Sequence, residues 1–299
     1  MFRFKSYSLR LCVVGVLGLL MAMIAPAFAD KVVITYSGAK TTAPSFGAIC
    51  AGITSCDYGM ENFTGWTGSS VFNSTFKDGG AGTYNQPTGV TFSGAYSAGT
   101  GTTTGAGGEW ISQTQNQFGG VNGQNYPELF GNAAPQVTKP GTGTATYNLA
   151  LSSAGVPGIN YFGIWISALD AYNNLVVYAG TTVVAQFNSQ ILLAQLGACP
   201  GSPANPFCGN PTPQFLGQDS GELFVYVNIY DLNGFITNVS FTNGGSTGFE
   251  SSNHAVAYLS QVNPVGTVVP EPGTLGLVAV GLLGLAKVRG KLRMKTAKR

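Results

Sequence analysis

A reactive hydroxyl beside a base is the first chemistry that the sequence allows us to test. The chain has a single histidine, His254, and a segment "GAYSAG" that nearly forms a nucleophile turn around Ser97. Such a turn needs Gly two residues before the Ser, where this chain has Ala95, and it leads into a helix rather than a Gly- and Thr-rich stretch. We therefore expect no Ser–His mechanism, and we expect His254 to pack or to donate a hydrogen bond at the surface.

Carboxylates offer two further kinds of chemistry. A pair of them about 5–10 Å apart cleaves glycosides, and the eleven acidic residues of the body allow many pairs, among which no sequence pattern selects one. Calcium binding is better supported, because hard cations take oxygen ligands. The segments "MENF" and "FESSNH" resemble the first and last strands of carbohydrate-binding jelly rolls that share a structural calcium ion, which makes Glu61, Glu250 and Asn253 the candidate ligands.

A third polar segment, "LDAYNN", adds Asp170, Asn173 and Asn174 as candidate calcium ligands. The alternative for all three segments is that Asn and Asp side chains cap turns by bonding to the nearby backbone. We favour that alternative.

Sugar binding is the remaining candidate activity. Exposed aromatic rings stack on sugars, while a few polar groups in a concave site bind hydroxyls. Trp66 and Trp110 flank Gly-rich segments and are the candidate ligand-binding residues, whereas Trp165 in "YFGIWISAL" reads as core. Aromatic residues of sheets mostly pack inside, which is the alternative for Trp66 and Trp110 as well.

Charge excludes one class of partner. The region 30–269 holds four Lys and no Arg against eleven Asp and Glu, so its net charge is −7. Nucleic-acid binding depends on neutralising phosphates with Lys and Arg, so we expect no nucleic-acid partner. An acidic body is equally unsuited to docking on anionic lipid.

The pattern of the body predicts an all-β fold. Short runs rich in Val, Ile, Tyr, Phe and Thr recur with turn residues between them, as in "KVVITYS", "TATYNLAL" and "ELFVYVNIYD". The segment 175–187 predicts a hairpin that turns near Gly180, and 188–197 predicts a helix capped by Asn188 or Ser189 and ended by Gly197. We predict an antiparallel β-sandwich or jelly roll with long Gly-rich loops.

Four cysteines remain in the body: Cys50, Cys56, Cys199 and Cys208. An even number in an exported protein favours disulfides, and four cysteines allow three pairings. Proximity in sequence favours Cys50–Cys56 and Cys199–Cys208. A zinc site is the alternative, but the spacings are loose and His254 lies far from every cysteine in sequence.

The first 29 residues have the layout of a secretory signal peptide. Three basic residues precede an apolar run from Leu11 to Phe28, and Ala27-Phe28-Ala29 fits a cleavage site for signal peptidase. The alternative is a permanent transmembrane anchor, which the cleavage site disfavours. We expect a cleaved N-terminal signal helix.

The other end of the chain combines three features. Pro270, Glu271 and Pro272 precede an apolar run over 273–286, and seven Lys or Arg follow in the last thirteen residues. The run is shorter than the ~20 residues of an ordinary span, but the basic residues after it fit the cytoplasmic face of a membrane. We expect a short membrane helix, with the prolines holding Glu271 in an extended segment beside it.

This order of features resembles the PEP-CTERM sorting signal of exported bacterial proteins, over residues 268–291. The resemblance implies recognition by an exosortase, which cuts near Pro-Glu-Pro. It also implies a Gram-negative-type envelope, transient tethering to the inner membrane, and a final place at the cell surface or in an extracellular polysaccharide matrix or biofilm. The body, over about 85–260, is similar to exosortase-dependent surface proteins with a jelly-roll-type domain.

These observations divide the chain into a signal peptide (1–29), a β-sandwich body (30–267) and a sorting signal (268–291, with a basic tail to 299). We expect an exported surface or matrix protein with a structural or adhesive role, not an enzyme. The alternatives are a carbohydrate-binding module, with or without calcium, and a glycan-active enzyme.

Overall fold

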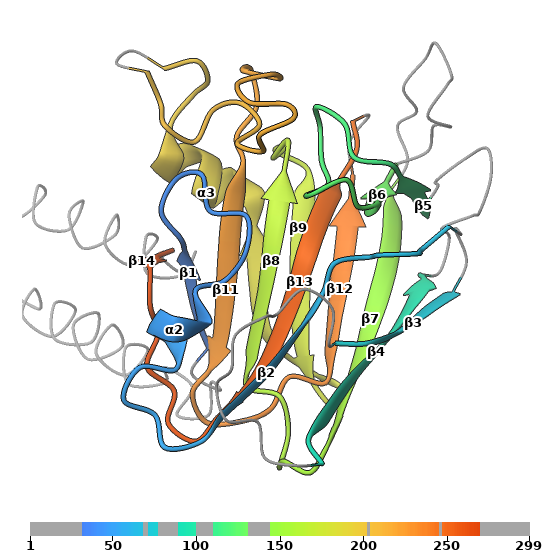
Figure 1. The fold of residues 1–299 in the computed structure, drawn as a ribbon, viewed down its shortest axis with the longest axis vertical. Helices are drawn as coiled ribbons and strands as arrows, with labels where there is room; N and C mark the ends of the chain where they lie inside the picture. Colours follow the sequence, from blue (N-terminus) through green and yellow to red (C-terminus); the bar gives the residue numbers. More distant parts are fainter. Residues whose placement is uncertain are drawn as a thin grey trace, which may run out of the picture.

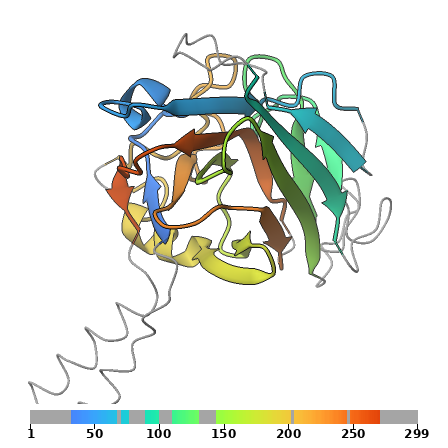
Figure 2. The ribbon, with the colours of Figure 1, turned by 90° about the horizontal axis from the view of Figure 1, so that it is seen from below.

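Two antiparallel sheets form the body of the protein. The computed structural model describes residues 32–67, 71–76, 89–99, 110–130, 144–201, 204–244 and 247–269. Figure 1 shows most of the longer strands running roughly along the long axis of the molecule, and Figure 2 shows the layers from below. The prediction of an antiparallel β-sandwich is therefore confirmed. The signal peptide, the Pro-Glu-Pro motif, the C-terminal apolar run and the Gly-rich segments 77–88 and 100–109 lie outside the described residues.

The first sheet has eight strands, of which β13 is the hub. In order they are β14 (Thr267–Val268), β1 (Val32–Tyr36), β11 (Val225–Asp231), β8 (Tyr161–Ser167), β13 (Glu250–Leu259), β6 (Tyr126–Leu129) and β5 (Trp110–Gln113), while β2 (Cys56–Glu61) also pairs with β13. The second sheet runs β10 (Thr182–Asn188), β9 (Asn173–Ala179), β12 (Asn238–Asn243), β7 (Ala145–Ala154), β4 (Thr91–Ala98) and β3 (Val71–Thr75). Two helices are described, α2 (Phe46–Ile49) and α3 (Ser189–Leu196).

Aromatic rings fill the space between the sheets. Trp110 stacks on Tyr147 with ring centroids 5.1 Å apart, and Tyr147 stacks on Phe241 at 4.3 Å. All three side chains are fully buried. Each large ring removes much apolar area from water and gains from offset or edge-on contact with its neighbours, so this layer holds the sandwich together.

Strand β13 changes partner along its length. It pairs with β8 on one side, and its other side pairs with β6 at Glu250 and with β2 from His254 onward. The β8 register shifts between Ser252 and Ala255, and Asn253 there has φ 46°. Asn tolerates this left-handed conformation better than most residues, so Asn253 allows the bulge at which the strand changes neighbours.

Local elements follow the sequence closely where turn and cap residues specify them. The hairpin of β9 and β10 turns at Gly180, whose φ is 61°. Helix α3 begins after Asn188, whose side chain accepts a hydrogen bond from the Gln190 N–H at 2.8 Å, and it ends at Gly197. Both predictions are confirmed.

The described chain ends in the sheet itself. Strand β14 pairs with β1, and the Val269 N–H donates to the Ile34 carbonyl oxygen at 2.8 Å. Val269 is buried, and Pro270 follows it directly. The body therefore extends two residues past 267, into the first residues of the predicted sorting signal. Among the described residues, no helix is long and apolar enough to cross a membrane.

The bulge gives a test of the fold. Replacing Asn253 by Gly keeps the left-handed backbone but removes the 2.7 Å bond from Asn253 Nδ2 to the Thr42 carbonyl oxygen, so we expect a loss of about 1 kcal/mol in unfolding free energy. Asn253→Val adds backbone strain, and we expect a loss of about 2–4 kcal/mol. Urea denaturation measures both. Asn238→Val in β12 is the control and should change little; equal losses for Gly and Val at position 253 would contradict the account of the bulge.

Candidate functional site

An acidic pocket of about 340 Å³ lies at one end of the sandwich. Its walls come from the ends of β5, β6 and β8, the start of β13 and the loops beside them, which meet toward the upper end of the molecule in Figure 1. Four carboxylates line it, from Glu128, Asp170, Glu222 and Glu250. No Lys, Arg or His is among its lining residues, so the pocket carries a concentrated negative character.

Two of the carboxylates form a buried pair. Glu250 on β13 lies opposite Glu128 on β6, and their side chains hydrogen bond to each other, which requires a proton on one of them. Burial raises the pKa of both, and the neighbouring Glu128 charge raises the pKa of Glu250 further. A Cβ at position 248 would collide with an oxygen of each carboxylate, so Gly248 is the residue that leaves room for the pair.

One oxygen of this carboxylate pair has no hydrogen-bond partner in the described part of the chain. Glu250 is only 4% exposed, and its Oε2 has no hydrogen-bond partner among the described residues. A buried carboxylate oxygen without a donor is costly. The carboxylate pair is therefore short of a hydrogen-bond donor at this atom, which is closed to solvent.

Asp170 and Glu222 also line the pocket, and Asp219 lies near both of them without lining it. The Asp170 carboxyl bonds to Thr247, and burial raises its pKa. Burial and the Asp170 charge raise the pKa of Asp219. Burial, together with repulsion from Asp170 and Asp219, raises the pKa of Glu222 to about 7. Close carboxylates oppose one another's ionisation, so Glu222 gains and loses its proton near neutral pH.

An apolar and amide surface completes the pocket. Phe118 is 39% exposed, and Phe130, Gln113 and Asn116 also line the space. The loop that carries Phe118 is fixed to the loop that precedes β11, because Asn210 Nδ2 donates to the Gln117 carbonyl oxygen at 2.9 Å. The pocket thus presents an aromatic ring and amides beside its carboxylates.

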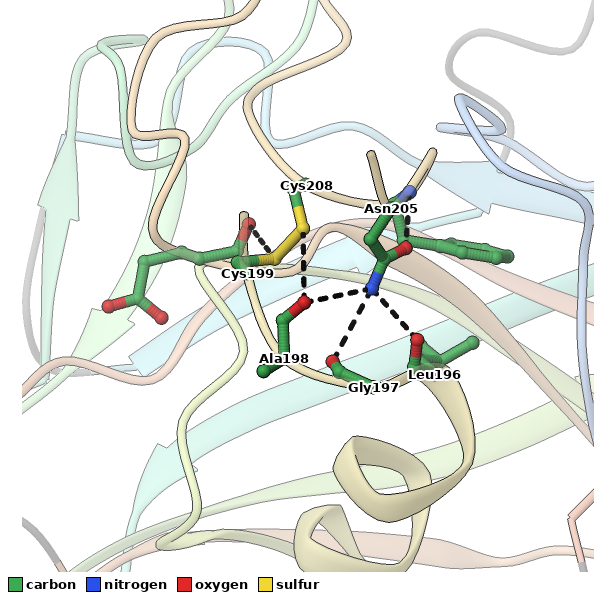
Figure 3. The surroundings of a disulfide bond; sticks show 8 residues. Leu196, Gly197, Ala198, Cys199, Asn205 and Cys208 are labelled. Carbon is green, nitrogen blue, oxygen red and sulfur yellow. Dashed lines mark hydrogen bonds between the residues drawn. A yellow bond between two sulfur atoms is a disulfide. The ribbon is translucent and has the colours of Figure 1, made fainter. Parts of the chain in front are cut away.

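A disulfide loop positions Glu222. Figure 3 shows the Cys199–Cys208 bond beyond the end of α3, with the Asn205 amide donating to the Leu196 carbonyl oxygen at 2.8 Å. Cys199 Sγ lies 3.4 Å from the Glu222 carbonyl oxygen, and the Gly209 N–H donates to the same oxygen at 3.1 Å. The loop therefore packs on the backbone of a pocket carboxylate. The other disulfide joins Cys50 to Cys56, so both bonds have the pairing that proximity favours.

The single histidine lies elsewhere, in a sealed network between the sheets. His254 Nδ1 is 3.2 Å from the Tyr96 hydroxyl, and its Nε2 is 3.0 Å from Ser251 Oγ, which in turn is 3.0 Å from the Tyr147 hydroxyl. All four side chains are fully buried. Burial lowers the pKa of His254 to about 3, so the ring is neutral at physiological pH. This chain of bonds joins the two sheets, and His254 packs inside rather than donating at the surface.

The three predicted calcium ligands do not meet. Glu61 lies opposite His254 in the β2–β13 pairing, whereas Glu250 is four residues earlier on β13, roughly 13 Å away at the usual rise per residue. Glu61 accepts a hydrogen bond from the Phe63 N–H, and Asn253 serves the bulge. Within the described ranges, no three His, Cys, Asp or Glu side chains gather in a group that could hold a metal ion.

The residues of the "LDAYNN" segment differ in whether they cap a turn or were candidates to bind a ligand. Asn173 Oδ1 accepts from the Asp170 N–H at 2.8 Å, and Asn174 Nδ2 donates to the Tyr172 carbonyl oxygen at 3.1 Å. Both asparagines therefore bond to the local backbone, as the turn-capping alternative predicts. Asp170 is the exception, because it also lines the acidic pocket.

The two tryptophans proposed for sugar binding are core residues. Trp66 is 3% exposed and Trp110 0%, and their ring centroids are 5.2 Å apart. Their flanking Gly-rich segments suggested exposure, but the rings fill the aromatic layer between the sheets. Neither face is open to a ligand, which corrects the prediction from sequence.

A second hollow, of about 360 Å³, lies over β3, β4 and β7. Its lining residues are small or uncharged, and none is aromatic. It lacks the charged and aromatic groups that give the acidic pocket its chemical character.

Sequence reasoning found parts of the acidic pocket but not the whole. Glu250 and Asp170 were candidates for another site, while Glu128, Glu222 and Phe118 were missed. The available signal was a carboxylate next to an apolar strand, in "YPELF" and "GELFVYV". Nothing in the sequence shows that these distant strand ends meet.

Comparison with protein families identifies the end of the chain. Residues 268–291 match the PEP-CTERM protein-sorting motif, the same residues that the sequence predicted. No curated protein and no solved structure matches the chain. The motif supports an exported surface protein that an exosortase processes and that a membrane anchor holds transiently.

The disulfide next to the pocket gives a local prediction. Replacing both Cys199 and Cys208 by Ser should lower the unfolding free energy by about 2–3 kcal/mol, as expected for a loop of this length. It should also speed hydrogen exchange at the Gly209 and Phe224 amides, which bond to Glu222 and Phe207. The control is the Cys50→Ser and Cys56→Ser pair, with similar loss of stability but no change at these amides. Equal exchange in the two variants would contradict the positioning role.

The raised carboxyl pKa values predict a pH dependence. A carboxyl whose pKa is raised by folding destabilises the fold once it ionises, so its contribution is most favourable below the unfolded pKa and is lost as pH rises through the folded value. For Glu222 this window runs from 4.5 to about 7. We expect the unfolding free energy to fall from pH 4.5 to 8, and Glu222→Gln to recover on the order of 1 kcal/mol at pH 8 after solvent screening. Identical pH profiles for both proteins, measured by denaturation, would refute this.

Proposed function

We propose that the mature protein is a structural or adhesive component of the cell surface or extracellular matrix, and not an enzyme. The observation that carries this proposal is the PEP-CTERM motif, which directly follows a folded body. Two disulfides and an aromatic core suit a domain that works outside the cell. In this proposal its partners are signal peptidase and exosortase during export, and matrix polysaccharide afterwards.

Carbohydrate binding is the second candidate, and the acidic pocket favours it. Carboxylates and amides bind hydroxyl groups, and a partly exposed ring such as Phe118 supports a sugar face. This pocket replaces Trp66 and Trp110 as the binding surface. A structural calcium ion remains part of this candidate only as an expectation, because its predicted ligands lie apart.

A glycan-active enzyme is the third candidate. Retaining glycosidases hold two carboxyl groups about 5–5.5 Å apart, and inverting enzymes hold them farther apart still. The Glu128 and Glu250 carboxyls are hydrogen-bonded to each other, which is closer than either mechanism needs. The pair therefore supports binding better than glycoside hydrolysis.

Intact mass of the protein from its host's envelope and medium tests the surface role. We expect the loss of residues 1–29 and a new C-terminus near Pro270–Pro272. Cleavage should leave Val269 in place, because its side chain is buried and its N–H bonds to β1. A mass that includes Arg299 would make the C-terminal segment a permanent anchor and overturn exosortase processing.

The structural or adhesive role has its own test. A strain without the gene should show weaker attachment or a looser matrix. A reintroduced gene whose protein is exported and processed should restore attachment and matrix. Full attachment in the deletion strain would leave the export route intact but remove the adhesive role.

A further inference from the structure

We propose that the acidic pocket binds a sugar that carries a protonated amine, such as a hexosamine unit with a free amino group. The proposal rests on the carbohydrate-binding candidate for the same pocket and names its ligand. It concerns a site assembled from Glu128, Asp170, Glu222, Glu250 and Phe118, far from one another in sequence but joined around one space.

Charge is the first step of the argument. Four carboxylates face the pocket, and none of its lining residues is basic. Lys40 is the only Lys or Arg in the part of the chain that the structure describes, and it lies between β1 and α2. An ammonium group would supply the missing positive charge, and charge-assisted hydrogen bonds are among the strongest that proteins form.

The leftover oxygen is the second step. Glu250 Oε2 has no donor among the described residues and is closed to solvent, so a ligand reaches it when the Glu250 side chain turns toward the pocket that this residue lines. An ammonium group brings three donors, which suits an oxygen of this kind together with its neighbours. The hydrogen bond between the Glu128 and Glu250 carboxyls holds a proton where an ammonium group would bind, so ligand binding should release a proton.

The dispersion of the carboxylates argues for an extended ligand rather than a bare metal ion. Calcium needs six to eight oxygen ligands at about 2.3–2.6 Å. The pocket carboxylates come from β6, β13 and two loops, and in the described residues no three acidic side chains form a group that could hold a metal ion. A volume of about 340 Å³ instead falls in the range of small-molecule pockets.

The other residues that line the pocket favour an amino sugar over a simple amine. Phe118 and Phe130 provide an apolar wall, and Gln113 and Asn116 stand beside the carboxylates. A hexosamine has a face of C–H groups, several hydroxyls and one ammonium, so it matches each of these surfaces. A simple alkyl amine would use the charge and leave the amides without a ligand partner.

Binding of defined oligosaccharides to the exported, processed protein tests the proposal. The probes are a glucosamine oligomer, the same oligomer with every amine acetylated, a neutral glucose oligomer, lysine as an amine without a sugar, and calcium chloride. We expect the glucosamine oligomer to bind at least about tenfold more tightly than each other probe at pH 6.5. Titration calorimetry in two buffers of different ionisation enthalpy should show proton release.

Two pairs of variants assign the binding to the pocket. Glu222→Gln and Glu250→Gln should each weaken glucosamine binding about tenfold, and thermal unfolding confirms that each variant is folded. Phe118→Ala should weaken it several-fold. Its matched control is Phe235→Ala, since Phe235 is equally exposed at 39% but packs near Gly158, at the opposite end of the strands.

Each outcome decides between the proposals. Equal binding of the acetylated and neutral oligomers would overturn the amine ligand and keep carbohydrate binding. Binding of calcium chloride alone, or of lysine as tightly as the sugar, would overturn the sugar. No binding by any oligomer would overturn both, while the surface role would still rest on processing and attachment.

Discussion

Burial of both faces and both edges of β13 is the constraint on which much of this structure depends. The strand pairs with β8 on one side and with β6 and β2 on the other, and nine of its ten residues are buried. Yet its first five residues, Glu250 to His254, are all polar. Polar groups in such a place must find partners or be solvated. The partners they find explain the main features of the interior.

Three arrangements occur within these five residues, and the Ser252 hydroxyl has no partner among the described residues. Ser251 and His254 bond to each other and to tyrosines of the facing sheet, which makes a closed link between the layers. Asn253 turns away through the bulge and bonds to the loop at Thr42. Glu250 bonds to another carboxylate, Glu128, and to its own backbone, and it lies where the sheet opens to the pocket. The need to satisfy buried polar groups thus produces a hydrogen-bonded link between the sheets at Ser251 and His254. At the adjacent Glu250 it leaves a carboxylate oxygen without a donor in the part of the chain that the structure describes.

The sequence predicted elements whose signals are local. Turn and cap residues located the β9–β10 hairpin and α3, and apolar runs located β1, β7, β8 and β11. The composition of "CDYGME" and "ESSN" gives no apolar run, and only the resemblance of "MENF" and "FESSNH" to jelly-roll strands indicated strands there. These segments are strands because long-range pairing buries them, which no local pattern records. The same reason hid the pocket, since Glu128, Asp170, Glu222 and Glu250 approach only after the sheets form. The prediction for Trp66 and Trp110 was wrong in the opposite sense. Nearby glycines suggested that the rings are exposed, but both rings are buried in the core.

The order of strands in the first sheet also separates the sorting motif from the acidic pocket. Strand β14, where the described chain ends before Pro270, is the edge of the first sheet, and β13 is four strands away through β1, β11 and β8. At a usual spacing of about 4.8 Å per strand this is roughly 19 Å. The sorting motif therefore leaves from one edge, while the pocket opens near β13, β6 and the loop held by the Cys199–Cys208 bond. A body tethered at that edge before processing therefore keeps the pocket well apart from its point of attachment.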